Sequence, residues 1–192
     1  MSEAADTPLH MHPSFDGLLD SFRSVIASLT WLKASSDQAQ SFFAPYPYVI
    51  ELSSTVSDQL IKIHKSILTQ IQNEGFNQQT PLFSRTLIDF YRILTIAIKD
   101  IVWAEDDFKT LLQTEHLQFL RHIRNACAHQ NMFYFGSGRE REATLKKLPV
   151  SWRGKVIDVS LEKLPLYMSF MGPGDLFLLL NDISNMVKAR QP

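Results

Sequence analysis

The sequence predicts an all-α protein, a bundle of four long helices with short helical pieces and a small β-hairpin before the C-terminal helix. Apolar residues recur every three or four positions over several stretches, which is the spacing of an amphipathic helix. Proline and glycine separate these stretches and mark the turns between them. One short stretch alternates around a glycine instead, as hairpins do. Helices that each bury one apolar stripe pack against one another as a bundle.

Length and composition indicate one globular domain. The chain has 192 residues, of which 45% are apolar and 20% charged, so it can bury a sizeable core. Residues 1–12 are polar and are expected to be a disordered tail, which leaves 13–192 as a single helical domain. No apolar run reaches the roughly 18–20 residues of a membrane span, the N-terminus lacks the pattern of a secretory signal, and Cys127 has no second cysteine to pair with. We therefore expect a cytoplasmic protein that does not contact membranes.

The N-terminal part is expected to supply two of the long helices. Ser14 can cap a first helix that extends to Lys33. A short helical piece over 35–43 follows, and two prolines then interrupt the chain. A second long helix is expected over 48–73, and Gly75 ends it. Its apolar stripe consists of Leu52, Val56, Leu60, Ile63, Ile67 and Ile71.

The rest of the chain is expected to form the remaining helices and the hairpin. The helix over 80–103 begins with threonine and proline, a good cap and a good first residue. The next helix runs from residue 114 to 129 or 130, with Asn131 as its candidate C-terminal cap. The hairpin covers 150–160, and the last helix covers 175–189 with its first residue, an aspartate, as cap.

The helix that ends near residue 129 carries a polar set suited to phosphate chemistry. At 100° per residue, its apolar side consists of Leu120, Ile123, Ala126 and Cys127. Its other side collects Arg121, His122, Arg124, Asn125 and His129. Arginine is always charged and histidine titrates near neutral pH, so such a helix can hold a phosphate and move a proton.

Arg124, Asn125 and His129 carry a resemblance to a known family. Four residues separate Arg124 from His129, and a polar residue follows the arginine directly. This stretch resembles the Arg-x4-6-His motif of HEPN domains, which are all-helical modules named for nucleotide binding in higher eukaryotes and prokaryotes. The resemblance implies a helical bundle and a metal-independent endoribonuclease of the toxin or defence type. It also implies a homodimer in which two such helices meet at one cleft, and an antitoxin or other protein as a further partner.

Each motif residue suits one role in RNA cleavage without a metal or cofactor. His129 can transfer the proton of the 2′-OH, and Arg124 can stabilise the charge that develops on the phosphate. Asn125 is a supporting residue that orients the phosphate or the imidazole. Arg121 and His122 are candidates to extend the RNA-binding face, with a solvated position as the alternative. In an ideal helix, the side chains of Arg124 and His129 point about 140° apart around the axis. This spacing favours a site shared by two chains over a site within one chain.

Other types of site find less support. A zinc site built from His122, Cys127 and His129 is not expected, because the cysteine projects away from both histidines and no fourth ligand is evident.

The net charge is −1, yet residues 121–155 hold eight Lys or Arg and only two Glu, so RNA attraction would be local. The aromatic run over 133–135 can stack on unpaired bases or belong to the core.

Two other functions stay open beside RNA cleavage. A non-catalytic HEPN module would bind RNA, a nucleotide or a partner protein with the same surface. A plain helical interaction protein would use Arg124 and His129 only in surface ion pairs or as a helix cap.

Overall fold

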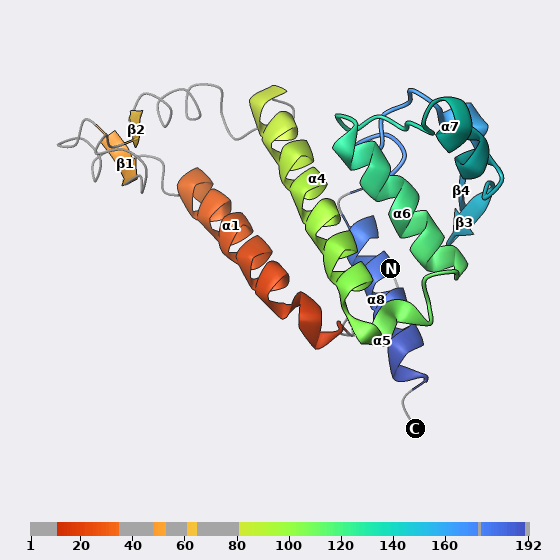
Figure 1. The fold of residues 1–192 in the computed structure, drawn as a ribbon. Helices are drawn as coiled ribbons and strands as arrows, with labels where there is room; N and C mark the ends of the chain where they lie inside the picture. The colour runs from red at the N-terminus through yellow and green to blue at the C-terminus, as the bar shows by residue number, and fades with distance from the viewer. Residues whose placement is uncertain (1–10, 35–47, 53–60, 65–80, 173, 191–192) are drawn as a thin grey trace, which may run out of the picture. The chain divides into compact units, whose positions relative to one another are not determined.

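The computed structural model describes residues 11–34, 48–52, 61–64, 81–172 and 174–190. This part of the chain is mainly helical, as predicted (Figure 1). In chain order its elements are η1 Pro13–Phe15, α1 Asp16–Ala34, β1 Tyr48–Leu52, β2 Ile61–His64, α4 Pro81–Ala104, α5 Asp106–Lys109, α6 Glu115–Ala128, α7 Gly138–Leu145, β3 Val150–Trp152, β4 Lys155–Ile157, η2 Val159–Leu161 and α8 Asp175–Lys188.

The chain divides into two compact units. One unit consists of Met1–Leu19 together with Ile88–Pro192, and the other of Asp20–Leu87. The single domain expected over 13–192 stays a prediction. Within the described residues, none of the helices combines the length and the apolar character needed to cross a membrane.

The expected helix over 48–73 is wrong where the structure describes it. Residues Tyr48–Leu52 and Ile61–His64 are strands that pair antiparallel, with Ile50 opposite Ile63. Both segments are rich in aromatic and β-branched residues, which favour an extended backbone. The other parts of this stretch, like the short helix expected over 35–43, lie outside the described residues.

The last residue of the predicted tail, His12, packs against the rest of the described structure. The backbone N–H of His12 donates to Ser184 Oγ at 2.8 Å, and its imidazole Nε2 lies 3.2 Å from Asp107 Oδ2. The ring packs against Phe108 with centroids 4.8 Å apart. His12, rather than Ser14, caps the first turn, since its ring nitrogen accepts from the Ser14 N–H. His12 therefore belongs to the folded protein, and residues 1–10 lie outside the described part.

Helix α6 is the centre of the larger unit. It packs against α8 and against strand β3. Its buried residues are Leu117, Phe119, Leu120, His122, Ile123, Ala126 and Cys127. The C-terminal part of α4 runs beside it (Figure 1), and Arg92 of α4 donates from Nε to the carbonyl of Cys127 at 2.9 Å. α6 is thus enclosed on more than one side, and only part of its circumference remains for solvent.

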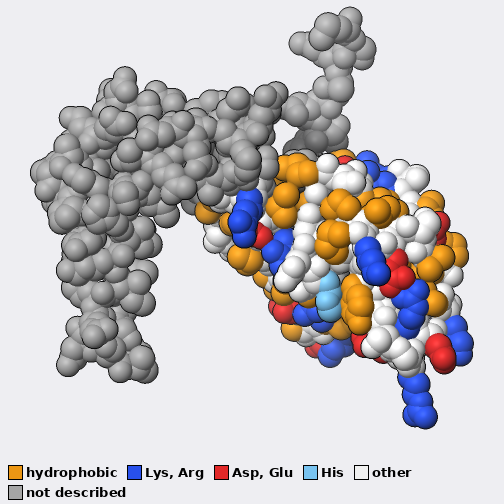
Figure 2. Space-filling view, turned by 90° about the horizontal axis from the view of Figure 1, so that it is seen from above, with side chains coloured by type: hydrophobic (Ala, Val, Ile, Leu, Met, Phe, Trp, Pro, Cys, Tyr) orange, Lys and Arg blue, Asp and Glu red, His pale blue; other side chains and the backbone are white. Residues whose placement is uncertain are grey.

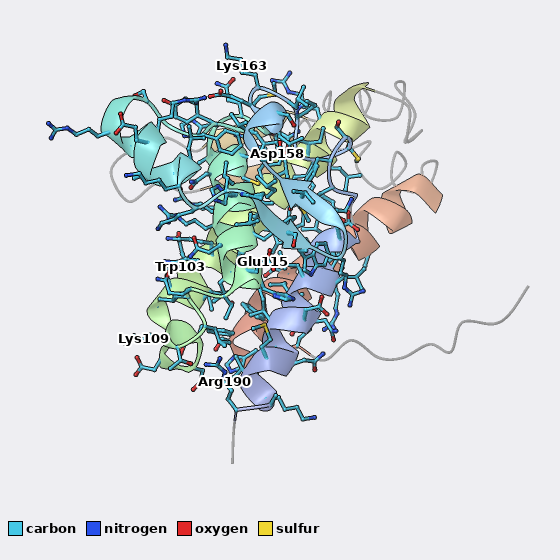
Figure 3. The ribbon with its side chains drawn as sticks, turned by 90° about the vertical axis from the view of Figure 1, so that its right-hand side faces the viewer. Trp103, Lys109, Glu115, Asp158, Lys163 and Arg190 are labelled. Atoms are coloured by element: carbon cyan, nitrogen blue, oxygen red, sulfur yellow. The ribbon has the colours of Figure 1, made fainter. Side chains whose placement is uncertain are left out.

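The predicted hairpin is confirmed as β3 and β4. Arg153 and Gly154 at its turn have φ values of +46° and +79°, the left-handed pair that matches the twist of a two-residue hairpin. A hairpin this short needs outside contacts to persist. Trp152 Nε1 donates to Asp182 of α8 at 2.9 Å, and Arg153 makes two hydrogen bonds of 2.8 Å to the same carboxylate. Glu115, at the start of α6 (Figure 3), accepts from the backbone of Ser151 at 3.1 Å.

Candidate functional site

The C-terminal end of α6 is closed by a tight left-handed turn. The helix ends at Ala128, and His129 is its C-cap, with its N–H donating to Asn125 O at 3.0 Å. Gln130 and Asn131 then have φ values of +57° and +67°. Left-handed residues of this kind end helices because they turn the chain away from the axis. Asn131, expected as the cap, lies two residues beyond it.

His129 is exposed to solvent next to an aromatic side chain. Its ring centroid lies 4.3 Å from that of Tyr134, with the two planes inclined by 48°. Because the cap residue has left the helical path, its side chain is not constrained to the face that the 100° spacing predicts. An exposed imidazole can exchange protons with a bound substrate or with water.

Arg121 and Arg124 of α6 carry positive charge without a carboxylate partner among the described residues. Both side chains are partly buried, and neither has a carboxylate within ion-pair distance among the described residues. The Nε of Arg124 is buried and has no hydrogen-bond partner in this part of the chain. Elsewhere in the larger unit, by contrast, arginines do pair with carboxylates, as Arg141 does with Glu162 and Arg153 with Asp182. Two guanidinium groups without counter-ions on one helix leave their charge available to an anion.

Among the described residues, no hydrogen bond joins the side chains of Arg124 and His129. Asn125 is partly buried and lies one turn before His129, whose N–H its carbonyl accepts. The backbone of His129 is thus hydrogen-bonded to that of Asn125, and its side chain packs against Tyr134. Arg124 lies in α6, one residue before Asn125.

His122 does not extend a solvent-facing RNA surface, contrary to one of the two expectations for it, nor is it a solvated neighbour. It is only 3% exposed, and its ring lies edge-on to Phe135 with centroids 6.1 Å apart. Burial, aided by the charges of Arg121 and Lys147, lowers the pKa of His122 from 6.5 to about 4. The imidazole is therefore neutral at pH 7. Helical spacing placed His122 on the polar side of α6. That assignment is wrong because the segment after α6 covers the helix on this side too.

His122 should make the protein less stable in mild acid. Its folded-state pKa lies below the unfolded value, so below pH 6.5 the unfolded chain takes up a proton that the folded chain does not. Stability should fall as the pH drops from 6.5 to about 4, by about 3 kcal/mol in all, and this contribution should then level off. Urea unfolding across this pH range measures it. His122→Leu should remove this part of the pH dependence, whereas His129→Ala should keep it. An unchanged slope in His122→Leu would contradict the assignment.

Cys127 belongs to a buried polar cluster with Thr95 and Tyr167. Burial raises the pKa of Cys127 to about 12, which keeps its thiol protonated. Nearby, the Tyr167 hydroxyl lies 2.6 Å from Thr95 Oγ1, and burial raises the pKa of Tyr167 well above 10. Among the described residues, no group of three or more His, Cys, Asp or Glu side chains could hold a metal ion.

Two residues hold the end of α6 in place through partners that the sequence did not indicate. Arg92 binds the Cys127 carbonyl and also donates to Asp89 at 2.6 Å, so a cation lies where the helix dipole is negative. Asn131 is 8% exposed, and its side-chain amide makes two hydrogen bonds to the backbone of Tyr167, at 2.8 and 3.2 Å. An asparagine just after a helix was a signal for the turn, but nothing in the sequence indicated its partner.

Comparison with known proteins found no match to this chain among protein-family models, curated proteins or solved structures.

Proposed function

We propose that this protein is a metal-independent endoribonuclease of the HEPN type, with Arg124 and His129 as its catalytic residues. One observation carries the proposal. An exposed imidazole lies at the end of α6, and two arginines of the same helix have no carboxylate partner among the described residues. A proton-transfer group and an uncompensated guanidinium are the two components that phosphodiester cleavage without a metal requires.

The chemistry is an internal transfer at phosphorus. His129 takes the proton of the 2′-OH, and the 2′-oxygen forms a bond to the adjacent phosphorus. The bond from phosphorus to the 5′-oxygen breaks, and that oxygen receives a proton from the His129 imidazolium, which returns to its neutral form. The products are an RNA ending in a 2′,3′-cyclic phosphate and an RNA beginning with a 5′-OH. The guanidinium of Arg124 hydrogen-bonds the equatorial oxygens, where charge develops.

The proposal includes a homodimer, because within one chain no hydrogen bond joins the two side chains among the described residues. Two copies related by a two-fold axis would place His129 of one chain against Arg124 of the other. The exposed apolar side chain of Met132, 37% exposed, is close in sequence to His129 and suits such an interface. Light scattering should give the mass of two chains in the preparation that cuts RNA.

The experiment that tests the proposal is RNA cleavage in the presence of EDTA. We expect purified protein to cut single-stranded RNA equally well with and without the chelator, because no step uses a metal. DNA and 2′-O-methyl RNA should resist, since neither has a free 2′-OH to attack. Loss of activity in EDTA would overturn the mechanism. RNA binding without cleavage under all conditions would favour the non-catalytic module instead.

That second candidate, a module that binds RNA without cutting it, is favoured by one observation. The imidazole of His129 is in contact with Tyr134, so the pair forms a partly exposed aromatic surface irrespective of proton transfer. Such a surface beside unpaired arginines can hold RNA by stacking and charge alone.

A further inference from the structure

The three consecutive aromatic residues after α6 differ sharply in burial. Phe133 and Phe135 are each only 1% exposed, and their rings pack against Phe170 and His122. Tyr134, between them, is 38% exposed. Alternation of this kind is what an extended backbone produces, because successive side chains point to opposite sides. The core therefore takes two of the three rings and leaves the third to solvent.

The exposed ring of Tyr134 is attached to a fixed backbone. The N–H of Phe133 donates to Leu164 O at 2.9 Å, and the N–H of Lys163 donates to Phe133 O at 2.9 Å. Met132 forms an isolated β-bridge with Pro165. With its neighbours buried and its segment paired, Tyr134 needs little further ordering to bind a ligand, which lowers the entropic cost of binding.

The surroundings of Tyr134 suit a base attached to a phosphate. The His129 ring next to it, at 4.3 Å, widens the aromatic surface. Arg141 is close enough for its charge to interact with the Tyr134 hydroxyl, but Glu162 binds its guanidinium in a two-pronged pair. Two other cations, Arg121 and Arg124 of α6, have no carboxylate partner among the described residues. Figure 2 shows one face of the molecule on which basic side chains stand among apolar ones.

We propose that Tyr134, with the ring of His129 beside it, stacks on an unpaired base of RNA, so that single-stranded RNA is the substrate class. The inference rests on the proposed function in one respect, that the stacked base adjoins the bond cut at His129. A base within a duplex has both faces covered by its neighbours and cannot stack on a protein ring. An unpaired base can, and stacking of this kind tolerates any base because each has a π-face.

The test measures binding and cleavage separately. The binding probe is a single-stranded 2′-O-methyl oligonucleotide containing 2-aminopurine, which resists 2′-OH chemistry and reports stacking by fluorescence quenching. Tyr134→Ala should weaken its binding about 5- to 150-fold and abolish the quenching. Tyr134→Leu should behave like the alanine variant while keeping apolar bulk, which covers the case in which alanine disturbs folding. Tyr134→Phe should bind within about twofold of wild type, because the π-face remains.

Leu164→Ala is the matched control. Leu164 is 47% exposed on the segment that pairs with Phe133, and its carbonyl persists in the variant. We expect it to bind the probe as wild type does. Equal binding by wild type and Tyr134→Ala, or an equal loss in Leu164→Ala, would overturn the stacking role.

The cleavage arm separates this inference from the proposed function. Wild type that binds the probe through Tyr134 yet never cuts RNA would remove the nuclease and keep the stacking site. If wild type cuts single-stranded and duplex RNA at equal rates, and Tyr134→Ala cuts both at the same rates as wild type, the stacking site is removed and the nuclease is kept. Absence of any RNA binding by wild type would overturn both.

Discussion

Replacing His129 with alanine should lower the rate of RNA cleavage by a factor of about 10²–10⁴, the usual effect of removing a proton-transfer group. Arg124→Ala should also lower the rate strongly, because the charge on the phosphate loses its guanidinium. Arg124→Lys should restore little, since an ammonium group lacks the planar fork that binds two phosphate oxygens. Asn125→Ala should have a smaller effect, because its proposed role is orientation. Cleavage rates on a single-stranded RNA, measured in EDTA, give these values.

The control for charge is Arg139→Ala. Arg139 is an exposed arginine of α7, outside α6, so its removal tests whether a cation elsewhere on the surface contributes to cleavage. We expect cleavage by this variant to stay close to wild type. Cleavage that persists in both His129→Ala and Arg124→Ala would eliminate these residues as the catalytic pair.

Replacing Ile123 with alanine should lower the free energy of unfolding by about 2–5 kcal/mol. The side chain is fully buried in α6, and its loss leaves a cavity that the packed helix can close only in part. Ile123→Val should cost about 0.5–1.5 kcal/mol, because it removes one methyl group rather than three carbons. Urea unfolding followed by circular dichroism measures both values.

The free energy of unfolding of Ile123→Ala is to be compared with that of His129→Ala. His129 is an exposed cap residue whose side chain, in the part of the chain that the structure describes, packs against Tyr134, so the variant should unfold within about 0.5 kcal/mol of wild type. A loss as large as that of Ile123→Ala would show that His129 has a structural role as core or cap. The plain interaction protein would then be the better interpretation of the motif.

Elements whose signals are local were predictable from the sequence. Pro81 begins α4 and Thr114 is the N-cap of α6, as their residue types indicate. Gly154 lies in the hairpin turn, where a positive φ is required. The burial of Ile123 and Cys127 also follows from helical spacing alone. In each case the determining interaction lies within a few residues along the chain.

Other features were decided by contacts between distant segments. The stretch from Tyr48 has apolar spacing that a helix can use, yet Tyr48–Leu52 pairs with Ile61–His64 as a strand, because short apolar runs do not distinguish the two structures. His122 is polar and was assigned to the outer side of its helix, yet Phe135 covers it.

The candidate site shows the same division. The sequence by itself determined that an arginine, an asparagine and a histidine occur near the end of one helix. Only the tertiary structure decided that His129 and Tyr134 are exposed together, that His122 is buried, and that Arg121 and Arg124 lack carboxylate partners among the described residues. The physical reason is that helical periodicity specifies one direction from the helix axis. The number of sides on which a helix is covered depends on which other segments pack against it.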